Sequence, residues 1–121
     1  MTLELEGLTK VYKDKTALDD VSFSFTPGIY GLLGPNGAGI STMMNLISDN
    51  LTPSKGRVLL DGRCIDELVS EYRKLLGYMP QQQNIYPELS LRRFLYFMAS
   101  LKGLKKCEAG DDIDHYVRMV K

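Results

Sequence analysis

Three glycines in the first third of the chain are spaced so that the backbone between them can surround an anion. Gly34, Gly37 and Gly39 belong to one short segment, which two hydroxyl residues, Ser41 and Thr42, follow at once. Glycine adopts positive φ angles at little cost, so such a segment can turn successive N–H groups inward and form a concave anion site. The residue types and their spacing therefore predict a loop that holds phosphate.

The segment comes within one residue of the phosphate-loop pattern G-x-x-x-x-G-K-[ST], whose lysine reaches the β- and γ-phosphates. Ile40 stands where that lysine belongs. The candidate phosphate-binding residues are Gly34, Pro35, Asn36, Gly37, Ala38, Gly39, Ile40, Ser41 and Thr42. We expect a loop shaped for a triphosphate but without its usual cation. The alternative is a glycine-rich turn that binds nothing, and the elements around the loop argue against it.

Two elements must position such a loop, a buried strand before it and a helix after it. The nearly all-apolar run 29–33 follows the turn Pro27-Gly28 and is typical of a strand buried on both faces. Apolar residues predict a helix from Ser41 to about Ser48. The first N–H groups of a helix are unpaired and its N-terminus is partly positive, so this order of elements favours phosphate.

Further strands precede and follow this unit. Segments 3–8 and 21–25 alternate apolar and polar residues, which predicts two strands in an antiparallel patch beside the loop strand, with a turn at 13–15 between them. Residues 57–60 form another short strand, which ends at the turn signal of 61–62.

A short helix over 69–74 and a core strand over 76–79 are expected next. Gln81 lies just beyond the end of that strand, where ligand-facing residues gather in open α/β sheets. Gln81 is therefore a candidate site residue, whereas Gln82 and Gln83 are expected to be solvated.

From Ser90 onward the pattern becomes helical. Ser90 suits an N-cap and Gly103 suits the end of that helix. A polar loop over 105–110 and a second helix over 111–120 are expected to follow. The acidic residues at the start of the second helix are interpreted as complementing its dipole rather than as a metal site. They are Asp111, Asp112 and Asp114.

Composition limits the classes of protein that the chain can represent. Its 121 residues make one domain or less, and 15 basic residues balance 15 acidic ones, which argues against a nucleic-acid-binding protein. Cys64 and Cys107 follow no metal-binding spacing and are expected to be reduced thiols. No apolar run approaches the ~18 residues of a membrane span, so any membrane role is expected to come through a partner.

Four motifs, in order, resemble those of ATP-binding cassette (ABC) transporter ATPases. Segment 34–42 resembles the Walker A motif, and 77–90 resembles the Q-loop with the Tyr-Pro-x-Leu-[ST] that follows it. Tyr12 with 17–23 resembles the adenine-stacking aromatic and the strand after it, and 53–62 resembles a glycine-containing hairpin of the family. The resemblance covers nearly the whole chain.

The resemblance implies an α/β fold: a truncated P-loop NTPase (RecA-like) core with an antiparallel β patch and the start of a helical subdomain. On this basis residues 1–89 are expected to form the N-terminal part of the core and residues 90–121 the start of the helical subdomain. Besides Ile40, the chain departs from the family in having no signature motif, no Walker B acids and no switch histidine, because His115 lies too early. We therefore expect roughly the first half of such a domain.

By the same resemblance, four residues receive roles that have simpler alternatives. Tyr12 stacks on adenine, unless it is an ordinary packing residue. Ser41 ligates Mg²⁺, which is compatible with capping the helix, and Thr42 touches the α-phosphate or is an ordinary first-turn residue. Gln81 contacts Mg²⁺ or the attacking water as the catalytic residue, unless it is a plain loop residue.

The resemblance implies a protein that uses ATP and Mg²⁺ to drive transport across a membrane. Its partners would be a transmembrane permease subunit and a second ATP-binding subunit, with no nucleic acid. It would lie in the cytoplasm, at the inner face of the membrane. Without the lysine we expect weak nucleotide binding and no hydrolysis. A non-enzymatic module that binds nucleotide or a transporter subunit is the alternative, and the combined motifs argue against another phosphate-loop enzyme, such as a small kinase.

Overall fold

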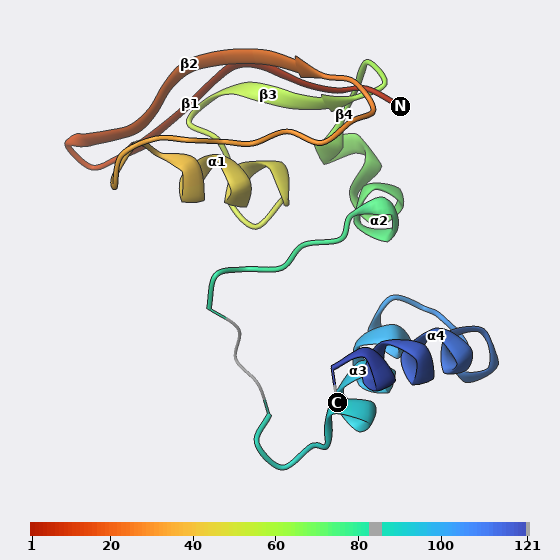
Figure 1. Ribbon diagram of the computed structural model, residues 1–121. Helices are drawn as coiled ribbons and strands as arrows, with labels where there is room; N and C mark the ends of the chain where they lie inside the picture. The colour runs from red at the N-terminus through yellow and green to blue at the C-terminus, as the bar shows by residue number, and fades with distance from the viewer. Residues whose placement is uncertain (83–85, 121) are drawn as a thin grey trace. The chain divides into compact units, whose positions relative to one another are not determined.

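The chain folds into two units, which are described separately. The computed structural model describes residues 1–82 and 86–120. The first unit comprises Met1–Tyr78, and the second comprises the chain from Met79 onward. Figure 1 shows the strands in the first unit and a helical pair in the second.

The first unit is built on a four-stranded antiparallel sheet. Its strands are β1 (Leu3–Tyr12), β2 (Lys15–Phe25), β3 (Lys55–Leu60) and β4 (Arg63–Cys64). They lie in the order β2-β1-β3-β4, so the long strand β1 pairs on both edges. The antiparallel patch that the alternating segments predict is confirmed, and so is the strand that ends at the turn of Asp61 and Gly62.

Irregular pairing shapes this sheet where glycines lie in its strands. Gly7 and Gly56 both have positive φ angles, 56° and 77°. A Cβ atom on Gly56 would lie 2.3 Å from the carbonyl oxygens of Glu6 and Gly7. The close approach of β3 to β1 at this point therefore requires glycine. The register of β1 shifts here against both of its neighbours.

Two helices cover one face of the sheet (Figure 1). Helix α1 spans Ile40–Ile47, as the sequence predicts, and α2 spans Ile65–Leu75. The buried core that joins helices and sheet consists of Leu5, Leu8, Leu18, Met43, Leu46, Val58, Leu60, Ile65, Leu68 and Tyr72. Leu8 and Leu46 are the most completely buried of these side chains, so truncating either to alanine would cost about 2–5 kcal/mol of stability.

Helix α2 is longer than the sequence predicts. The expected helix over 69–74 begins four residues earlier, at Ile65, and it is broken at Val69, whose φ of 2° and ψ of −73° are not helical. Ile65 and Leu68 are buried against the sheet. This packing extends the helix because buried apolar contacts outweigh weak local propensity.

Two predicted strands are absent from the described residues. The run 29–33 forms no strand, and the side chains of Ile29 and Leu33 are fully exposed, at 104% and 98%. The run 76–79 is likewise irregular, with Met79 81% exposed. A strand needs a neighbour to satisfy its backbone N–H and C=O groups, and the described strands supply none to either run.

The second unit is a helical pair formed by α3 (Leu91–Leu101) and α4 (Lys106–Met119). The predicted cap is confirmed, because the Oγ atom of Ser90 accepts a hydrogen bond of 3.4 Å from the backbone N–H of Arg93. Gly103 follows α3 with a φ of 77°. The two helices pack through Leu95, Tyr96 and Ala99 of α3 and Ala109, Ile113 and Val117 of α4.

The start of α4 corrects two predictions. The helix begins at Lys106 rather than Asp111, so residues 106–110 of the expected polar loop are helical and Lys105 is the N-cap. The packing of Ala109 favours this earlier start. Asp111, Asp112 and Asp114 therefore lie inside the helix and not at its N-terminus. Asp114 pairs with Arg92 of α3.

None of the helices in residues 1–82 and 86–120 combines the length and the apolar character that crossing a bilayer requires.

Candidate functional site

The glycine-rich segment makes a tight turn that leads directly into α1. Gly37 and Gly39 have φ angles of 90° and 83°, as a phosphate-holding loop requires. The backbone N–H of Ala38 donates to the carbonyl oxygen of Pro35 at 3.0 Å, which closes the turn. The N–H of Met43 donates to the carbonyl oxygen of Gly39 at 2.8 Å and begins the helix. The loop geometry expected from the glycine spacing is present.

The start of α1 is suited to an anion. Its N-cap is Gly39, and no side chain accepts a hydrogen bond from the first turn, so the alternative role of Ser41 as a helix cap is wrong. The first turn carries no acidic residue that would repel phosphate. Ser41 is exposed and Thr42 is half-buried, as the second and third residues of the helix. The unpaired N–H groups of the first turn and the positive end of the helix dipole therefore favour an anion here, at the end of α1 that carries two hydroxyl residues.

The side chain of Ile40 lies close to Gly34 at the beginning of the loop. A Cβ atom on Gly34 would lie 3.4 Å from the Cδ1 atom of Ile40 and 2.9 Å from the Cβ atom of Ala38. The half-buried Ile40 side chain therefore lies close to the first glycine of the loop. It brings an apolar group to the place where the phosphate-loop pattern has an ammonium group.

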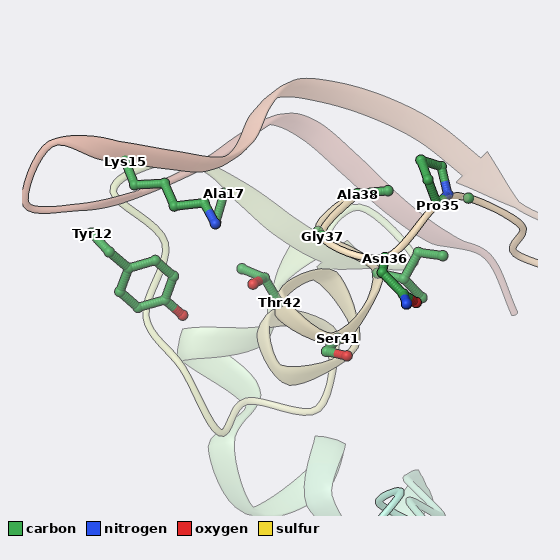
Figure 2. Close-up of a pocket in the computed structure, with 12 residues that line it drawn as sticks. Tyr12, Lys15, Ala17, Pro35, Asn36, Gly37, Ala38, Ser41 and Thr42 are labelled. Atoms are coloured by element: carbon green, nitrogen blue, oxygen red, sulfur yellow. The ribbon is translucent and has the colours of Figure 1, made fainter.

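The loop lines an open pocket of about 440 Å³, within the usual range of small-molecule sites (Figure 2). All nine residues from Gly34 to Thr42 take part. Three residues of the β1–β2 hairpin complete the lining, Tyr12, Lys15 and Ala17. The structure thus brings Tyr12 to the same pocket as the loop, as the resemblance implies.

The ring of Tyr12 lies at the end of β1 with 45% of the residue exposed. The ammonium group of Lys10 lies 5.4 Å from the ring centroid, in the range of a cation–π contact. Lys10 also donates to the carbonyl oxygen of Thr52 at 2.6 Å. These contacts fix the cation beside the ring, while the ring itself remains part of the pocket lining.

Gln81 is exposed and belongs to the second unit, whereas the loop belongs to the first. Its predicted roles as catalytic residue and Mg²⁺ ligand therefore stay predictions. Gln83, which was expected to be solvated, lies outside the described residues together with Asn84 and Ile85 of the Q-loop motif. Gln82 is exposed, as expected. Within residues 1–82 and 86–120, no group of three or more His, Cys, Asp or Glu residues could hold a metal ion.

Sequence reasoning missed two residues of the pocket, Lys15 and Ala17, and only Lys15 is charged. Lys15 follows the hairpin turn and carries no motif of its own, so only the pairing of Tyr12 with Lys15 across the hairpin places it beside the loop. A basic residue three positions after the candidate stacking aromatic is the one signal that could have drawn attention to it.

The sheet, the loop and the helix after it define a P-loop domain, and comparisons place it in a family. The family model described as "ABC transporter" matches residues 18–121. The chain therefore belongs to the ABC transporter family.

Its similarity is to the ATP-binding proteins of that family. It is 38% identical over 104 residues to the probable multidrug ABC transporter ATP-binding protein YbhF of Escherichia coli, over 85% of this chain and 18% of that protein. It is 35% identical over 108 residues to the linearmycin resistance ATP-binding protein LnrL of Bacillus subtilis, over 88% of this chain and 35% of that one. An uncharacterized ABC transporter ATP-binding protein of Methanocaldococcus jannaschii is 32% identical over 98% of this chain and 41% of its own length. The chain thus spans less than half of each of these relatives.

Solved structures agree with this fold. The ATP-binding subunit of an ABC transporter superimposes with a TM-score of 0.73 and 28% identity, over 92% of this chain and 47% of that one. A bacterial Atm1-family ABC exporter with ATP bound gives a TM-score of 0.64 and 30% identity, over 70% of this chain and 15% of that one. The α/β P-loop fold expected from the motifs is confirmed.

Proposed function

We propose that this chain is part of an ATP-binding subunit of an ABC transporter, that it holds ATP weakly and that it does not hydrolyse it. The observation that carries the proposal is the loop itself. Its two glycines with positive φ lead into the N-terminus of α1, and Ile40 occupies the place of the lysine.

The backbone cradle supports binding without the lysine. One hydrogen bond to a charged group contributes about 1.5–3 kcal/mol, so the substitution costs roughly a ten- to hundredfold loss of affinity. The backbone N–H groups and the helix N-terminus are unaffected by the side chain at position 40. Binding at high nucleotide concentration is therefore expected to remain.

Hydrolysis is expected to be lost because phosphoryl transfer depends on cations that stabilise the departing γ-phosphoryl group. Removing one preorganised stabiliser costs ~10²–10³ in rate. Ile40 offers neither charge nor a hydrogen-bond donor in its side chain.

Mg²⁺, when bound, would supply positive charge that offsets the negative charge of the phosphates. The exposed hydroxyl of Ser41 at the start of α1 fits a ligand role, because it lines the same pocket as the loop. We propose that Ser41 would hold the ion. For Gln81, which belongs to the second unit, the family resemblance supports the separate proposal that it contacts Mg²⁺ or the attacking water. Thr42 would touch the α-phosphate.

Membership of the family also supports proposals about partners and location. We propose that the chain acts on the cytoplasmic side of a membrane, bound to a transmembrane permease subunit and paired with a second ATP-binding subunit. The second candidate function is a non-enzymatic module that binds nucleotide or a transporter subunit, which the apolar residue at position 40 favours.

A titration of the purified chain with ATP and Mg²⁺ tests the central proposal. At a free ATP concentration of about ten times the Kd, binding stabilises the folded state by about 1.4 kcal/mol, which raises the melting temperature by several degrees. We expect this rise with ATP and ADP, together with phosphate release no faster than in a buffer blank. An unchanged melting temperature at saturating nucleotide would refute binding, and release above the blank would refute the absence of hydrolysis.

A further inference from the structure

Lys15 lines the nucleotide pocket although no motif includes it. It is the first residue of β2 and pairs directly with Tyr12, the last residue of β1. Only Lys13 and Asp14 separate the two, so the hairpin fixes Lys15 on the Tyr12 side of the pocket. In Figure 2 its side chain runs from β2 toward the side of the pocket where Thr42 lies.

The charge of Lys15 is isolated within this pocket. Of the 12 lining residues, all in the part of the chain that the structure describes, it alone carries a charged side chain. The described ion pairs use other cations, with Arg57 bound to Glu6, Arg73 to Asp49 and Arg92 to Asp114. No described carboxylate lies within ion-pair distance of the Lys15 ammonium group. The ammonium group is therefore available to a bound anion.

We propose that Lys15 supplies the cation that the loop lacks, by pairing with the α- and β-phosphates of a bound nucleotide. This inference rests on the proposed binding of nucleotide. Lysine binds phosphate as a point charge on a flexible stem, so it can act from a strand as well as from the loop. If the base stacks on Tyr12, the phosphates nearest the nucleoside lie nearest Lys15. The γ-phosphate would lie farther from Tyr12 and Lys15.

This assignment explains how a loop with Ile40 can still hold nucleotide without activating the γ-phosphate. A cation on the α- and β-phosphates strengthens the binding of ADP and ATP alike. It leaves the departing γ-phosphoryl group without the added charge that hydrolysis requires.

Calorimetric titration of ADP and ATP into the full chain tests the inference. The informative variant is Lys15→Met, which removes the charge and keeps an unbranched side chain. The matched control is Lys55→Met, because Lys55 is also an exposed strand lysine but does not line the pocket. We expect Lys15→Met to weaken both nucleotides about five- to tenfold at low salt, and Lys55→Met to change neither by more than about twofold. Lys15→Arg, which keeps the charge, should bind within about threefold of the wild type.

Two further measurements identify the phosphate as the partner. The affinity of the wild type for ADP should fall more steeply with added salt than that of Lys15→Met, because screening weakens only the charged contact. Adenosine, followed by nuclear magnetic resonance titration, should bind the wild type and Lys15→Met equally. An equal loss with adenosine would mean that Lys15 acts through Tyr12, and would overturn the inference.

The outcomes separate this inference from the proposed function. If the wild type binds neither ADP nor ATP, the proposed function fails. If the wild type binds both and Lys15→Met matches Lys55→Met, only the role of Lys15 fails. A loss confined to ATP would overturn the assignment to the α- and β-phosphates. Melting curves without nucleotide establish that each variant is folded.

Discussion

Gly39 lies directly against the backbone of Ala17. A Cβ atom on Gly39 would be only 2.2 Å from the carbonyl oxygen of Ala17, far inside van der Waals contact. This approach joins the phosphate loop to the hairpin that carries Tyr12 and Lys15. The two parts of the pocket therefore hold their relative position through a contact that only glycine permits.

We expect Gly39→Ala to disrupt both the loop and nucleotide binding, because the loop must move away from Ala17. Gly37→Ala is the matched control, since Gly37 also has a positive φ angle but has open space around its Cβ position. The control should lose about 1–2 kcal/mol of stability, the usual cost of a left-handed residue, and Gly39→Ala should lose more. Urea unfolding and ADP titration measure the difference. Equal effects in the two variants would show that the contact with Ala17 does not position the loop.

Ile40→Lys should tighten ATP binding about ten- to hundredfold, because the new ammonium group reaches the β- and γ-phosphates. Turnover should remain at the level of a buffer blank, since phosphoryl transfer also depends on positioning a water molecule and on further cations. Calorimetry and a phosphate-release assay measure the two quantities. Ile40→Met serves as the control that changes shape without adding charge. An affinity gain in that control equal to the gain in Ile40→Lys would contradict a role for charge.

Tyr12→Ala should weaken ATP binding by roughly tenfold, because base stacking on an aromatic ring contributes about 1–3 kcal/mol. Tyr12→Phe should bind ATP about as well as the wild type, since the ring is kept. Inorganic tripolyphosphate has no base, so its affinity should be the same in all three proteins. If Tyr12→Ala weakened tripolyphosphate as much as ATP, the ring would be supporting the loop rather than stacking on adenine.

Tyr72 links α2 to α1, and its ionisation lowers the free energy of unfolding at alkaline pH. Its hydroxyl donates to the carbonyl oxygen of Ile47 at 2.5 Å, and the residue is only 4% exposed. Burial, and then the negative charge of Asp49, raise the pKa of Tyr72 above its ordinary value of 10.0. The stabilising contribution is therefore complete below pH 10 and is lost as the pH rises through the folded-state pKa.

We expect Tyr72→Phe to cost about 0.5–1.5 kcal/mol at neutral pH, through loss of the hydrogen bond to Ile47. The gap between wild type and variant should narrow above pH 10, because phenylalanine has no proton to lose. Urea unfolding at neutral pH and at about pH 11 measures the gap. Tyr116→Phe is the control, since Tyr116 is 60% exposed. A gap that stayed constant or widened would show that the buried phenol does not set the alkaline limit.

The sequence alone determined the parts of the site that depend on local geometry. The glycine spacing predicted a turn with positive φ angles at Gly37 and Gly39, and the residues after it predicted α1. Alternating residues predicted β1 and β2, and Ser90 predicted the cap of α3. Each of these features follows from the conformational preferences of a few neighbouring residues, so a short stretch of sequence contains the necessary information.

The tertiary structure decided the features that depend on distant partners. The apolar run 29–33 has the composition of a buried strand, yet it forms none. A strand also requires a neighbouring strand that hydrogen-bonds its backbone N–H and C=O groups. The pairing of Tyr12 with Lys15 brought a lysine without a motif into the pocket. The composition of a segment determines which secondary structures it can form. Strand pairing and packing determine which residues come into contact, and both depend on segments that are distant in the sequence.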